Sequence, residues 1–238
     1  MASLVLGHRG YPMKYPENTI ASFLAAVLYG ADGVELDVWL SSDGVPVVIH
    51  DRSTGRVAGV DVDVKKTSVG ELKKLHLGLG QTIPSLEEVF RALPYDTLVA
   101  IEIKDVDAVE PVYELVKKYN LFDRVFIISF IEEALKRMRS LDPKIKLGLN
   151  IDSLEKAQRA IELARELNLY SINPPIQGIE VVGVNVFKNY LKTVKSIGCR
   201  VMLWTVNDPK VLADLTELYD VVITDNVETL VKTIRSIE

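Results

Sequence analysis

The stretch Gly33–Asp51, GVELDVWLSSDGVPVVIHD, decides how the rest of the chain is interpreted. Apolar residues alternate with Glu35, Asp37 and Trp39, and a period of two predicts a strand over residues 33–39. Every second side chain of a strand lies on the same face, so Glu35 and Asp37 are expected to point the same way. The sequence therefore predicts two neighbouring carboxylates on one strand.

The residues after this strand predict a hairpin. Ser41–Gly44 are typical turn residues, so residues 45–50 are expected to return as an antiparallel strand. A four-residue loop would pair Leu40 with Val45 and, by counting back, set His50 opposite the first carboxylate. Two carboxylates this close repel each other unless a cation lies between them. The stretch is therefore either a metal site or the polar face of an exposed hairpin.

Composition excludes several classes of protein. The chain has 238 residues, 48% of them hydrophobic and 26% charged, which is enough to bury one large core. A net charge of −5 argues against a nucleic-acid or anionic-membrane surface, so any phosphate site must be local. A single cysteine, Cys199, excludes an internal disulfide. With no secretion signal and no apolar run long enough for membrane insertion, we expect a cytoplasmic protein.

Strand and helix patterns alternate along most of the chain, with no low-complexity linker between them. Eight strand-helix units predict a single (β/α)8 TIM-type barrel domain over residues 1–238, with an extra hairpin strand near residues 45–50. An open doubly wound sheet is the alternative, but it would need a glycine-rich nucleotide loop after the first strand. The expected barrel strands are residues 3–8, 33–39, 98–104, 124–130, 144–149, 170–173, 200–206 and 220–224.

Local patterns add four smaller expectations. Asn18 is expected to cap the first helix, whose apolar face would consist of Ile20, Phe23, Leu24, Val27 and Leu28. His76 is expected on a surface helix, and residues 176–184 are expected to form a loop.

The barrel interpretation gives the polar residues a common location. Functional side chains of such barrels lie at the C-terminal ends of the strands, above an interior filled with apolar side chains. Charged residues at that end of three separate strands are costly unless they bind something. The polar residues at the expected strand ends are His8, Arg9, Glu35, Asp37, Glu102, Lys104, Ser129, Trp204, Asn207 and Asp225.

Six short motifs follow one another in a specific order and spacing. They are His8-Arg9-Gly10, Pro16-Glu17-Asn18-Thr19, Glu35-x-Asp37, His50-Asp51, Glu102-x-Lys104 and Trp204-Thr205-x-Asn207. Together they resemble the glycerophosphodiester phosphodiesterase family over essentially the whole chain. The resemblance implies a (β/α)8 barrel and metal-dependent hydrolysis of a small-molecule glycerophosphodiester to glycerol 3-phosphate and an alcohol. By that resemblance the metal ligands are Glu35, Asp37 and Glu102, the acid–base pair is His8 and His50, and the phosphate-binding residues are Arg9 and Lys104.

The chemistry of these side chains agrees with the resemblance. Phosphodiester hydrolysis builds negative charge on the phosphoryl oxygens, and stabilising that charge is most of the catalytic problem. Three carboxylates suit a hard divalent cation, Mg²⁺ or Ca²⁺, with Mn²⁺ as a further choice. We expect His50 to be the general acid and His8 the general base. The nucleophile is either water or the glycerol 2-hydroxyl of the substrate.

The remaining candidates would shape the pocket. Trp204 and Phe130 are expected to line a glycerol pocket, with Asn207 beside them. Glu17 and Asn18 are expected to support the site in addition to capping the first helix.

The sequence departs from the family pattern at two places. Family members often carry a Leu-x-Arg-Thr-Thr-like stretch after the His-Asp pair, whereas this chain has Arg52–Arg56. The last strand often ends in Thr-Asp-x-Pro, whereas Thr224–Val227 lacks the proline. Both departures lie at the pocket rim, so they bear on which alcohol is accepted.

Other functions compete with this one. A phospholipase D-like or lyase-type enzyme would cut a bulkier lipid phosphodiester and would need an apolar rim, and the sequence shows no amphipathic insertion of that kind. A non-catalytic barrel binding protein would lack at least one motif residue. A divalent-metal sugar isomerase would not need Arg9 and Lys104. The charged residues could also form a purely structural network of ion pairs.

Overall fold

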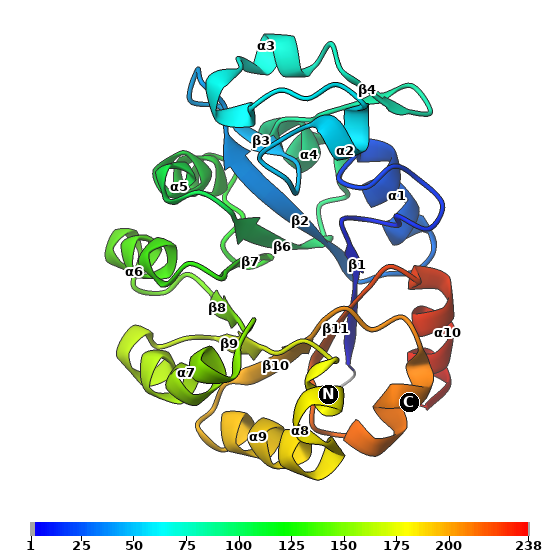
Figure 1. Cartoon of the computed structure of the whole chain (residues 1–238), viewed down its shortest axis with the longest axis vertical. Coiled ribbons are helices and arrows are strands. Elements are labelled where there is room, and N and C mark those ends of the chain that lie inside the picture. The colour runs from blue at the N-terminus through cyan, green and yellow to red at the C-terminus, as the bar shows by residue number, and fades with distance from the viewer. Residues whose placement is uncertain (1–2, 238) are drawn as a thin grey trace.

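Eight parallel strands close into a barrel in the computed structural model, which describes residues 3–237 (Figure 1). The strands neighbour one another in the order β1-β2-β6-β7-β8-β9-β10-β11, and β11 pairs with β1 to close the barrel. The expected (β/α)8 TIM-type barrel and its extra hairpin strand are confirmed. The barrel strands are β1 (Leu4–His8), β2 (Gly33–Leu40), β6 (Leu98–Ile103), β7 (Val125–Ser129), β8 (Leu147–Asn150), β9 (Ser171–Asn173), β10 (Arg200–Leu203) and β11 (Val221–Thr224), and the extra strand is β3 (Pro46–Val48).

Helical segments connect successive barrel strands and cover the outside of the barrel (Figure 1). The main ones are α1 (Ile20–Leu28), α4 (Leu86–Ala92), α5 (Val109–Lys118), α6 (Glu132–Leu141), α7 (Leu154–Leu167), α9 (Val184–Ser196), the 3₁₀ helix η3 (Pro209–Leu215) and α10 (Val227–Ile237). The shorter elements are α2 (Gly55–Ala58), η1 (Val64–Lys66), α3 (Val69–Leu72), β4 (His76–Gly78), β5 (Gln81–Thr82), η2 (Val106–Ala108) and α8 (Gly178–Val182). Among the described residues, no helix is both long and apolar enough to cross a membrane.

The single domain expected over residues 1–238 stays a prediction. Residues 1, 2 and 238 of that range lie outside the described part of the chain.

Two layers of apolar side chains hold the barrel. The larger layer lies between the strands and the helices, where Val5, Val99 and Val201 pack. The strand neighbours of these residues, such as Leu6 and Ala100, point the other way and fill the barrel interior. Because alternation continues along β6, the residue two positions after Ala100 also faces inward, and that residue is Glu102. The site carboxylates therefore lie directly above an apolar plug.

The hairpin forms, but its predicted register is wrong by one residue. Leu40 lies opposite Pro46 and not opposite Val45. The loop is therefore Ser41–Val45, one residue longer than predicted, and it is closed by the Ser41 hydroxyl, which accepts the Val45 N–H and donates to the Val45 carbonyl, each at 3.0 Å. His50 consequently lies beyond the end of β3, in the segment that enters the next loop.

The N-cap of the first helix lies one residue after the predicted one. Thr19 is the N-cap, and its hydroxyl accepts the Ser22 N–H at 3.3 Å. Asn18 does not cap the helix, because its side-chain amide donates to the Asp37 carboxylate at 2.9 Å. The buried Asp37 carboxylate therefore binds the Asn18 side chain that the sequence pattern predicted as the helix cap.

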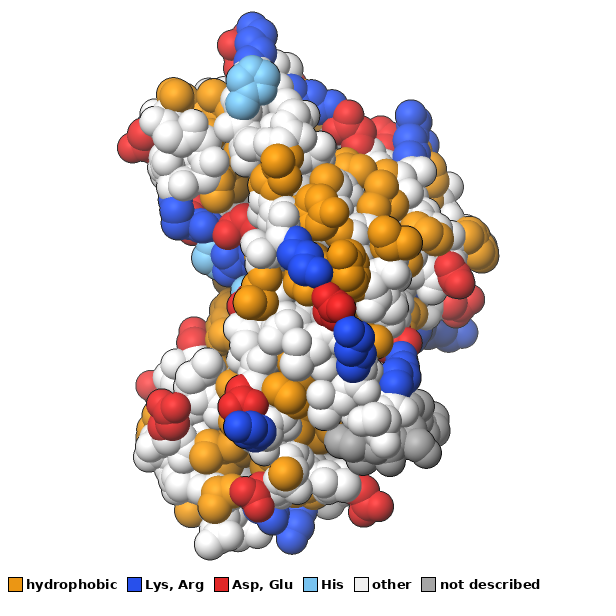
Figure 2. Space-filling view, turned by 90° about the vertical axis from the view of Figure 1, so that its right-hand side faces the viewer, with side chains coloured by type: hydrophobic (Ala, Val, Ile, Leu, Met, Phe, Trp, Pro, Cys, Tyr) orange, Lys and Arg blue, Asp and Glu red, His pale blue; other side chains and the backbone are white. Residues whose placement is uncertain are grey.

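The predicted buried face of α1 is confirmed only in part. Phe23 is buried, and Ile20 and Val27 are partly buried against the core, as expected. Leu28 is 83% exposed and Leu24 is 40% exposed, whereas Phe23, Ala25 and Ala26 are buried. Figure 2 shows apolar side chains gathered on the upper half of this side of the molecule, next to a row of charged side chains. Phe23 and the small residues Ala25 and Ala26 pack into the core, which leaves Leu24 and Leu28 on the outside of the helix.

The chain between β3 and α4 forms a small unit of its own at the top of Figure 1. It contains α2, η1, α3 and the β4–β5 hairpin, and Val47, Val64, Leu72 and Ile83 form a separate apolar cluster beneath it. His76 lies in β4 and is exposed, so the helix predicted for it is wrong, although its surface location is as expected.

The loop predicted over residues 176–184 is wrong as well. Five of its residues form the short helix α8, which packs against α9. Pro174–Pro175 end the preceding strand, and the Ile176 N–H donates to the Trp204 carbonyl at 2.7 Å, which directs the chain into the helix.

Gly33→Ala should destabilise the fold by about 2 kcal/mol or more, because a new methyl group in a packed wall must displace its neighbours. A Cβ atom at this position would lie 2.1 Å from the Leu98 carbonyl oxygen on β6. Denaturant unfolding measures the change. Gly70→Ala is the matched control, because no atom lies within 4 Å of the Cβ position in α3. Equal stability changes in the two variants would contradict the packing argument.

Candidate active site

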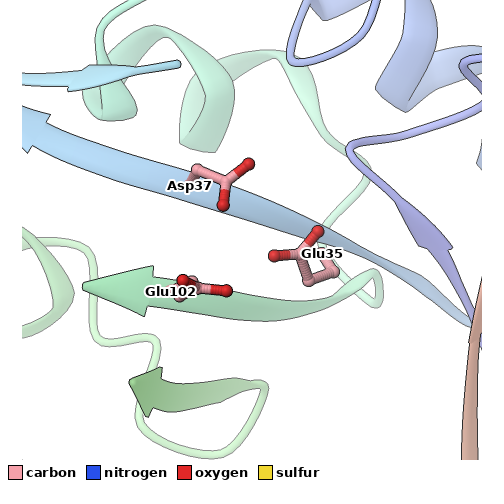
Figure 3. A group of neighbouring side chains, drawn as sticks. All are labelled: Glu35, Asp37 and Glu102. Atoms are coloured by element: carbon pink, nitrogen blue, oxygen red, sulfur yellow. The ribbon is translucent and has the colours of Figure 1, made fainter. Parts of the chain in front are cut away.

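Three carboxylates converge at the C-terminal end of the barrel. Glu35 and Asp37 come from β2 and Glu102 from β6, and the strand register places Asp37 directly beside Glu102. Each residue offers an oxygen within 4.8 Å of the other two. Figure 3 shows the three carboxylates turned toward a common space. All three are buried, with exposed fractions of 2%, 1% and 7% respectively, so solvent does little to screen their mutual repulsion.

Two cationic side chains lie against this group. The Lys104 ammonium bonds the Asp37 carboxylate at 3.1 Å and also bonds Glu102. The Arg9 guanidinium lies 3.4 Å from the other Asp37 oxygen. Burial would raise the pKa of Asp37, but Lys104 and Arg9 lower the pKa below its usual value. Asp37 therefore stays ionised at the centre of the cluster.

The negative charges of the other two carboxylates, Glu35 and Glu102, are not fully balanced by neighbouring cations. Burial, reinforced by the charge of Asp37, raises the pKa of Glu35 to about 8 and the pKa of Glu102 to about 7. Three carboxylates and two cationic side chains leave one net negative charge, and an anionic phosphodiester would add another. A donor set of three buried carboxylate oxygens with this surplus of negative charge fits a hard divalent cation.

His8 is held between two carboxylates. Its Nδ1 lies 2.7 Å from the Asp225 carboxylate, and its Nε2 lies 4.0 Å from Glu35. Asn207 donates its side-chain amide to the other Asp225 oxygen at 2.8 Å, which fixes this carboxylate in place. Burial would lower the pKa of His8, but Asp225 and Glu35 raise the pKa above its usual value. An Nδ1–H donor toward Asp225 leaves Nε2 directed at the carboxylate group.

His50 also has a carboxylate at Nδ1, but its pKa shifts in the opposite direction to that of His8. Its Nδ1 lies 2.6 Å from the Asp51 carboxylate, and the Trp39 indole N–H donates to the His50 carbonyl at 2.9 Å. Burial lowers the pKa of His50; Asp37 raises this pKa, while Lys104 lowers it further, and the net shift is downward. This imidazole therefore stays neutral more readily than His8.

Arg56 connects the carboxylate partner of His50 with the carboxylate partner of Arg9, and the sequence patterns did not predict this role. Its guanidinium donates to Asp51 at 2.5 Å and to both oxygens of Glu17 at 2.7 and 2.8 Å. Glu17 in turn accepts from Arg9 at 3.0 Å. A chain of ion pairs thus runs from Asp51, the partner of His50, to Arg9. The only sequence signal was the basic residue in the stretch that departs from the family pattern.

Two asparagines were also missed. Asn150 at the end of β8 donates to Glu102 at 3.2 Å, and Asn173 at the end of β9 donates to Asn150 at 2.8 Å. Both lie at the C-terminal ends of barrel strands, so their position was a usable signal.

Aromatic side chains form one wall. The rings of Phe130 and Trp204 meet edge to face at 5.6 Å, and the Lys104 ammonium lies 5.7 Å from the Phe130 ring. The Trp204 indole N–H donates to the Asn173 carbonyl at 2.7 Å, which holds this ring in place. A cavity of about 90 Å³ lies between this wall and the charged group.

The structure brings most of the predicted residues to this one cavity. The predicted residues that line it are His8, Arg9, Glu35, His50, Glu102, Lys104, Phe130 and Trp204. The others contact residues of this group: Asp37 pairs with both Arg9 and Lys104, Asn18 donates to Asp37, Glu17 accepts from Arg9, and Asn207 donates to Asp225. A barrel whose C-terminal end gathers buried carboxylates, cationic side chains and two imidazoles has the site of a phosphodiester hydrolase.

Comparison with known proteins gives this class a family. The model of the Glycerophosphoryl diester phosphodiesterase family matches residues 8–229, so the chain belongs to this family of enzymes. The glycerophosphodiester phosphodiesterase of Caldanaerobacter subterraneus subsp. tengcongensis is 34% identical over 99% of both chains.

Solved structures agree with this assignment. A glycerophosphodiester phosphodiesterase from Thermotoga maritima superposes with a TM-score of 0.86 and 36% identity, over 98% of this chain and 99% of that one. A phosphodiesterase from Oleispira antarctica, solved with its product sn-glycerol-3-phosphate, superposes with a TM-score of 0.85 and 27% identity, over 99% and 97% of the two chains.

Glu35→Gln should stabilise the metal-free protein at high pH. A carboxyl group whose pKa rises from 4.5 to about 8 on folding keeps its proton longer in the folded state. Wild-type stability therefore falls as the pH rises through this range, and the amide variant avoids the loss. In EDTA we expect Glu35→Gln to gain roughly 2 kcal/mol or more in unfolding free energy at pH 9, and a much smaller gain at pH 5. Denaturant unfolding at both pH values measures this.

Asp37→Asn is the matched comparison. Its carboxylate has a lowered pKa and binds Lys104, Arg9 and Asn18, so the variant should lose stability at both pH values. A similar loss of stability in both variants at pH 9 would contradict the charge balance described above.

Proposed function

We propose that this protein hydrolyses glycerophosphodiesters to glycerol 3-phosphate and an alcohol, with a divalent cation bound by Glu35, Asp37 and Glu102. One observation carries the proposal: a single cavity is lined by buried carboxylates, two cationic side chains and two imidazoles that each have a carboxylate at Nδ1. The Caldanaerobacter and Thermotoga relatives named above are glycerophosphodiester phosphodiesterases, and the structure of the Oleispira phosphodiesterase holds the expected product.

The metal ion and the two cationic side chains would together bind the negative charge of the substrate phosphate. A divalent cation at the three carboxylates, Mg²⁺, Ca²⁺ or Mn²⁺, would polarise the phosphoryl group. Arg9 can donate two parallel hydrogen bonds to phosphate oxygens, and Lys104 adds a compact positive charge. The aromatic wall of Trp204 and Phe130 is suited to the carbon face of the glycerol.

The two imidazoles carry the proton transfers. His8 lies between two carboxylates, which favours the imidazolium form, whereas His50 faces the cations Lys104 and Arg9 and favours the neutral form. We therefore assign His8 as the general acid for the leaving alcohol and His50 as the general base. This is the reverse of the order expected from the sequence.

The cellular setting follows from composition. The single cysteine and the acidic net charge are consistent with a cytoplasmic enzyme whose partner is a small molecule and not a nucleic acid.

Release of glycerol 3-phosphate from glycerophosphocholine tests the function. We expect no release in EDTA and restored release with one of Mg²⁺, Ca²⁺ or Mn²⁺. His8→Ala and His50→Ala should each lower kcat by about 10² to 10⁴, the usual size of a general acid–base contribution. His76→Ala, at an exposed position in β4, is the control and should retain full activity. No release with any metal from a folded protein would reject the proposal.

The same assay with a p-nitrophenyl ester of glycerol 3-phosphate assigns the two histidines. p-Nitrophenolate leaves without a proton, so loss of the general acid should matter little. We expect His8→Ala to recover most of its activity on this ester and His50→Ala to stay inactive. Recovery by His50→Ala alone would show the opposite order.

Arg56→Gln should affect the positions of both His50 and Arg9. Because Arg56 orients Asp51 and Glu17, its loss should lower kcat through His50 and raise KM through Arg9, by about tenfold in kcat/KM together. Arg52→Gln is the matched control, since Arg52 pairs with Asp63 in the same segment between β3 and α4. Equal effects of the two substitutions would show that Arg56 has no positioning role.

A further inference from the structure

Two buried asparagines connect a carboxylate of the active site with its aromatic wall. Asn150 ends β8 and Asn173 ends β9, and the parallel register of these neighbouring strands (Figure 1) places the two residues directly side by side. Their exposed fractions are 3% and 0%. Asn150 donates to Glu102 at 3.2 Å, and Asn173 donates to Asn150 at 2.8 Å. We call these two residues the asparagine pair.

The Glu102 carboxylate determines the orientation of both side-chain amides. An ionised carboxylate only accepts hydrogen bonds, so the Asn150 amide presents its Nδ2 to Glu102 and its Oδ1 to β9. Asn173 meets that oxygen with its own Nδ2. Each amide therefore has a single orientation, and Asn173 reaches Glu102 only through Asn150.

The backbone of Asn173 is held from two sides. Its carbonyl accepts the Trp204 indole N–H at 2.7 Å and the Ile151 backbone N–H at 3.0 Å. Gly148 on β8 leaves room for the Asn173 side chain, because a Cβ atom at that glycine would lie 2.8 Å from the Asn173 Nδ2. The donor that orients Asn150 is therefore itself held in place.

The two oxygens of Glu102 have different partners. Lys104 bonds Oε1, whereas Asn150 bonds Oε2. Lys104 also bonds Asp37, and it is the candidate partner of the substrate phosphate. The Asn150 amide is neutral, so it can orient Glu102 without reducing the negative charge that attracts a metal ion.

The asparagine pair has no evident benefit for folding. The interior of such a barrel is normally filled with branched apolar side chains, as Leu6 and Ile128 do here. Within residues 3–237, the buried Oδ1 of Asn173 has no hydrogen-bond partner, and an unpaired polar atom in the interior destabilises a fold. The site above the pair explains these polar side chains better than packing does.

We propose that Asn150 is a positioning residue for the metal ligand Glu102, and that Asn173 acts through Asn150. The proposal rests on the metal site of the proposed function and adds the residues that tune its affinity. A hydrogen bond from outside the ligand set orients a metal-binding carboxylate and strengthens metal binding. Asn150 would keep the Glu102 carboxylate turned toward Glu35 and Asp37 before the ion binds.

Calorimetric titration of the protein, freed of metal by EDTA and dialysis, with Mn²⁺, Mg²⁺ or Ca²⁺ tests the proposal without substrate. Asn150→Ala should weaken metal binding by about 10- to 100-fold, the usual effect of removing a partner of a metal ligand. Asn173→Ala leaves Asn150 and Glu102 unchanged and should weaken binding less. The double variant should bind no more weakly than Asn150→Ala, because the effects of residues that act in series do not add.

Ser171→Ala is the matched control. Ser171 lies on the same strand as Asn173, is 0% exposed, and has a hydroxyl without a hydrogen-bond partner in the described part of the chain. This variant should bind metal as the wild type does. Denaturant unfolding in EDTA checks that each variant folds, and if Asn150→Ala does not fold, the comparison of Asn173→Ala with Ser171→Ala decides the question.

The metal dependence of the rate separates positioning from general damage to the site. On glycerophosphocholine, Asn150→Ala should need a higher metal concentration for half of its maximal rate, and saturating metal should restore most of the wild-type kcat. A low kcat that no metal concentration restores would overturn the positioning role, because weakened metal binding alone is overcome by mass action.

The outcomes separate this proposal from the function on which it rests. Weaker metal binding by Asn150→Ala, in a protein that hydrolyses no glycerophosphodiester, would support the positioning role and reject the hydrolysis. Metal-dependent hydrolysis with equal metal affinity in the wild type and Asn150→Ala would overturn the positioning role and leave the hydrolysis intact. Additive losses in the double variant, or equal losses in Asn173→Ala and Ser171→Ala, would overturn the role of Asn173. A folded wild type that binds none of the three ions would overturn both proposals.

Discussion

The structure depends on the charge balance among three buried carboxylates and two cations. Glu35, Asp37 and Glu102 would repel one another strongly in a space that excludes water, and only Asp37 has both cations as partners. The cost appears in the raised pKa values of the other two carboxylates. A bound cation would offset this uncompensated charge, whereas burying such charge contributes nothing to the stability of the fold.

The barrel strands hold these charged side chains in fixed positions. Parallel pairing of β2 with β6 sets Asp37 beside Glu102, and the apolar plug below keeps the group at the mouth of the barrel. The segments between the strands add further groups: Asn18 comes from the segment before α1, and Arg56 comes from α2, which follows β3. The rigid strands hold the charges in register, and the loops orient the groups that surround them.

Much of this could be predicted from the sequence. Period-two patterns and the spacing of the polar residues placed eight strands and most of the charged group in the right places, because strand alternation depends only on local geometry. The hairpin register, the cap of α1 and the helix α8 could not be predicted in this way. Each depends on a partner far along the chain or on a side chain that takes up a different bond, as Ser41, Asn18 and Trp204 do.

The sequence by itself determined the fold class, the residues of the charged group and the family to which the chain belongs. Only the tertiary structure decided how these residues contact one another and their neighbours: His8 lies between Asp225 and Glu35, and Arg56 connects Asp51 with Glu17. The physical reason is that secondary structure follows from local periodicity, whereas the pairing of charges and the exposure of apolar surface depend on how distant segments pack together.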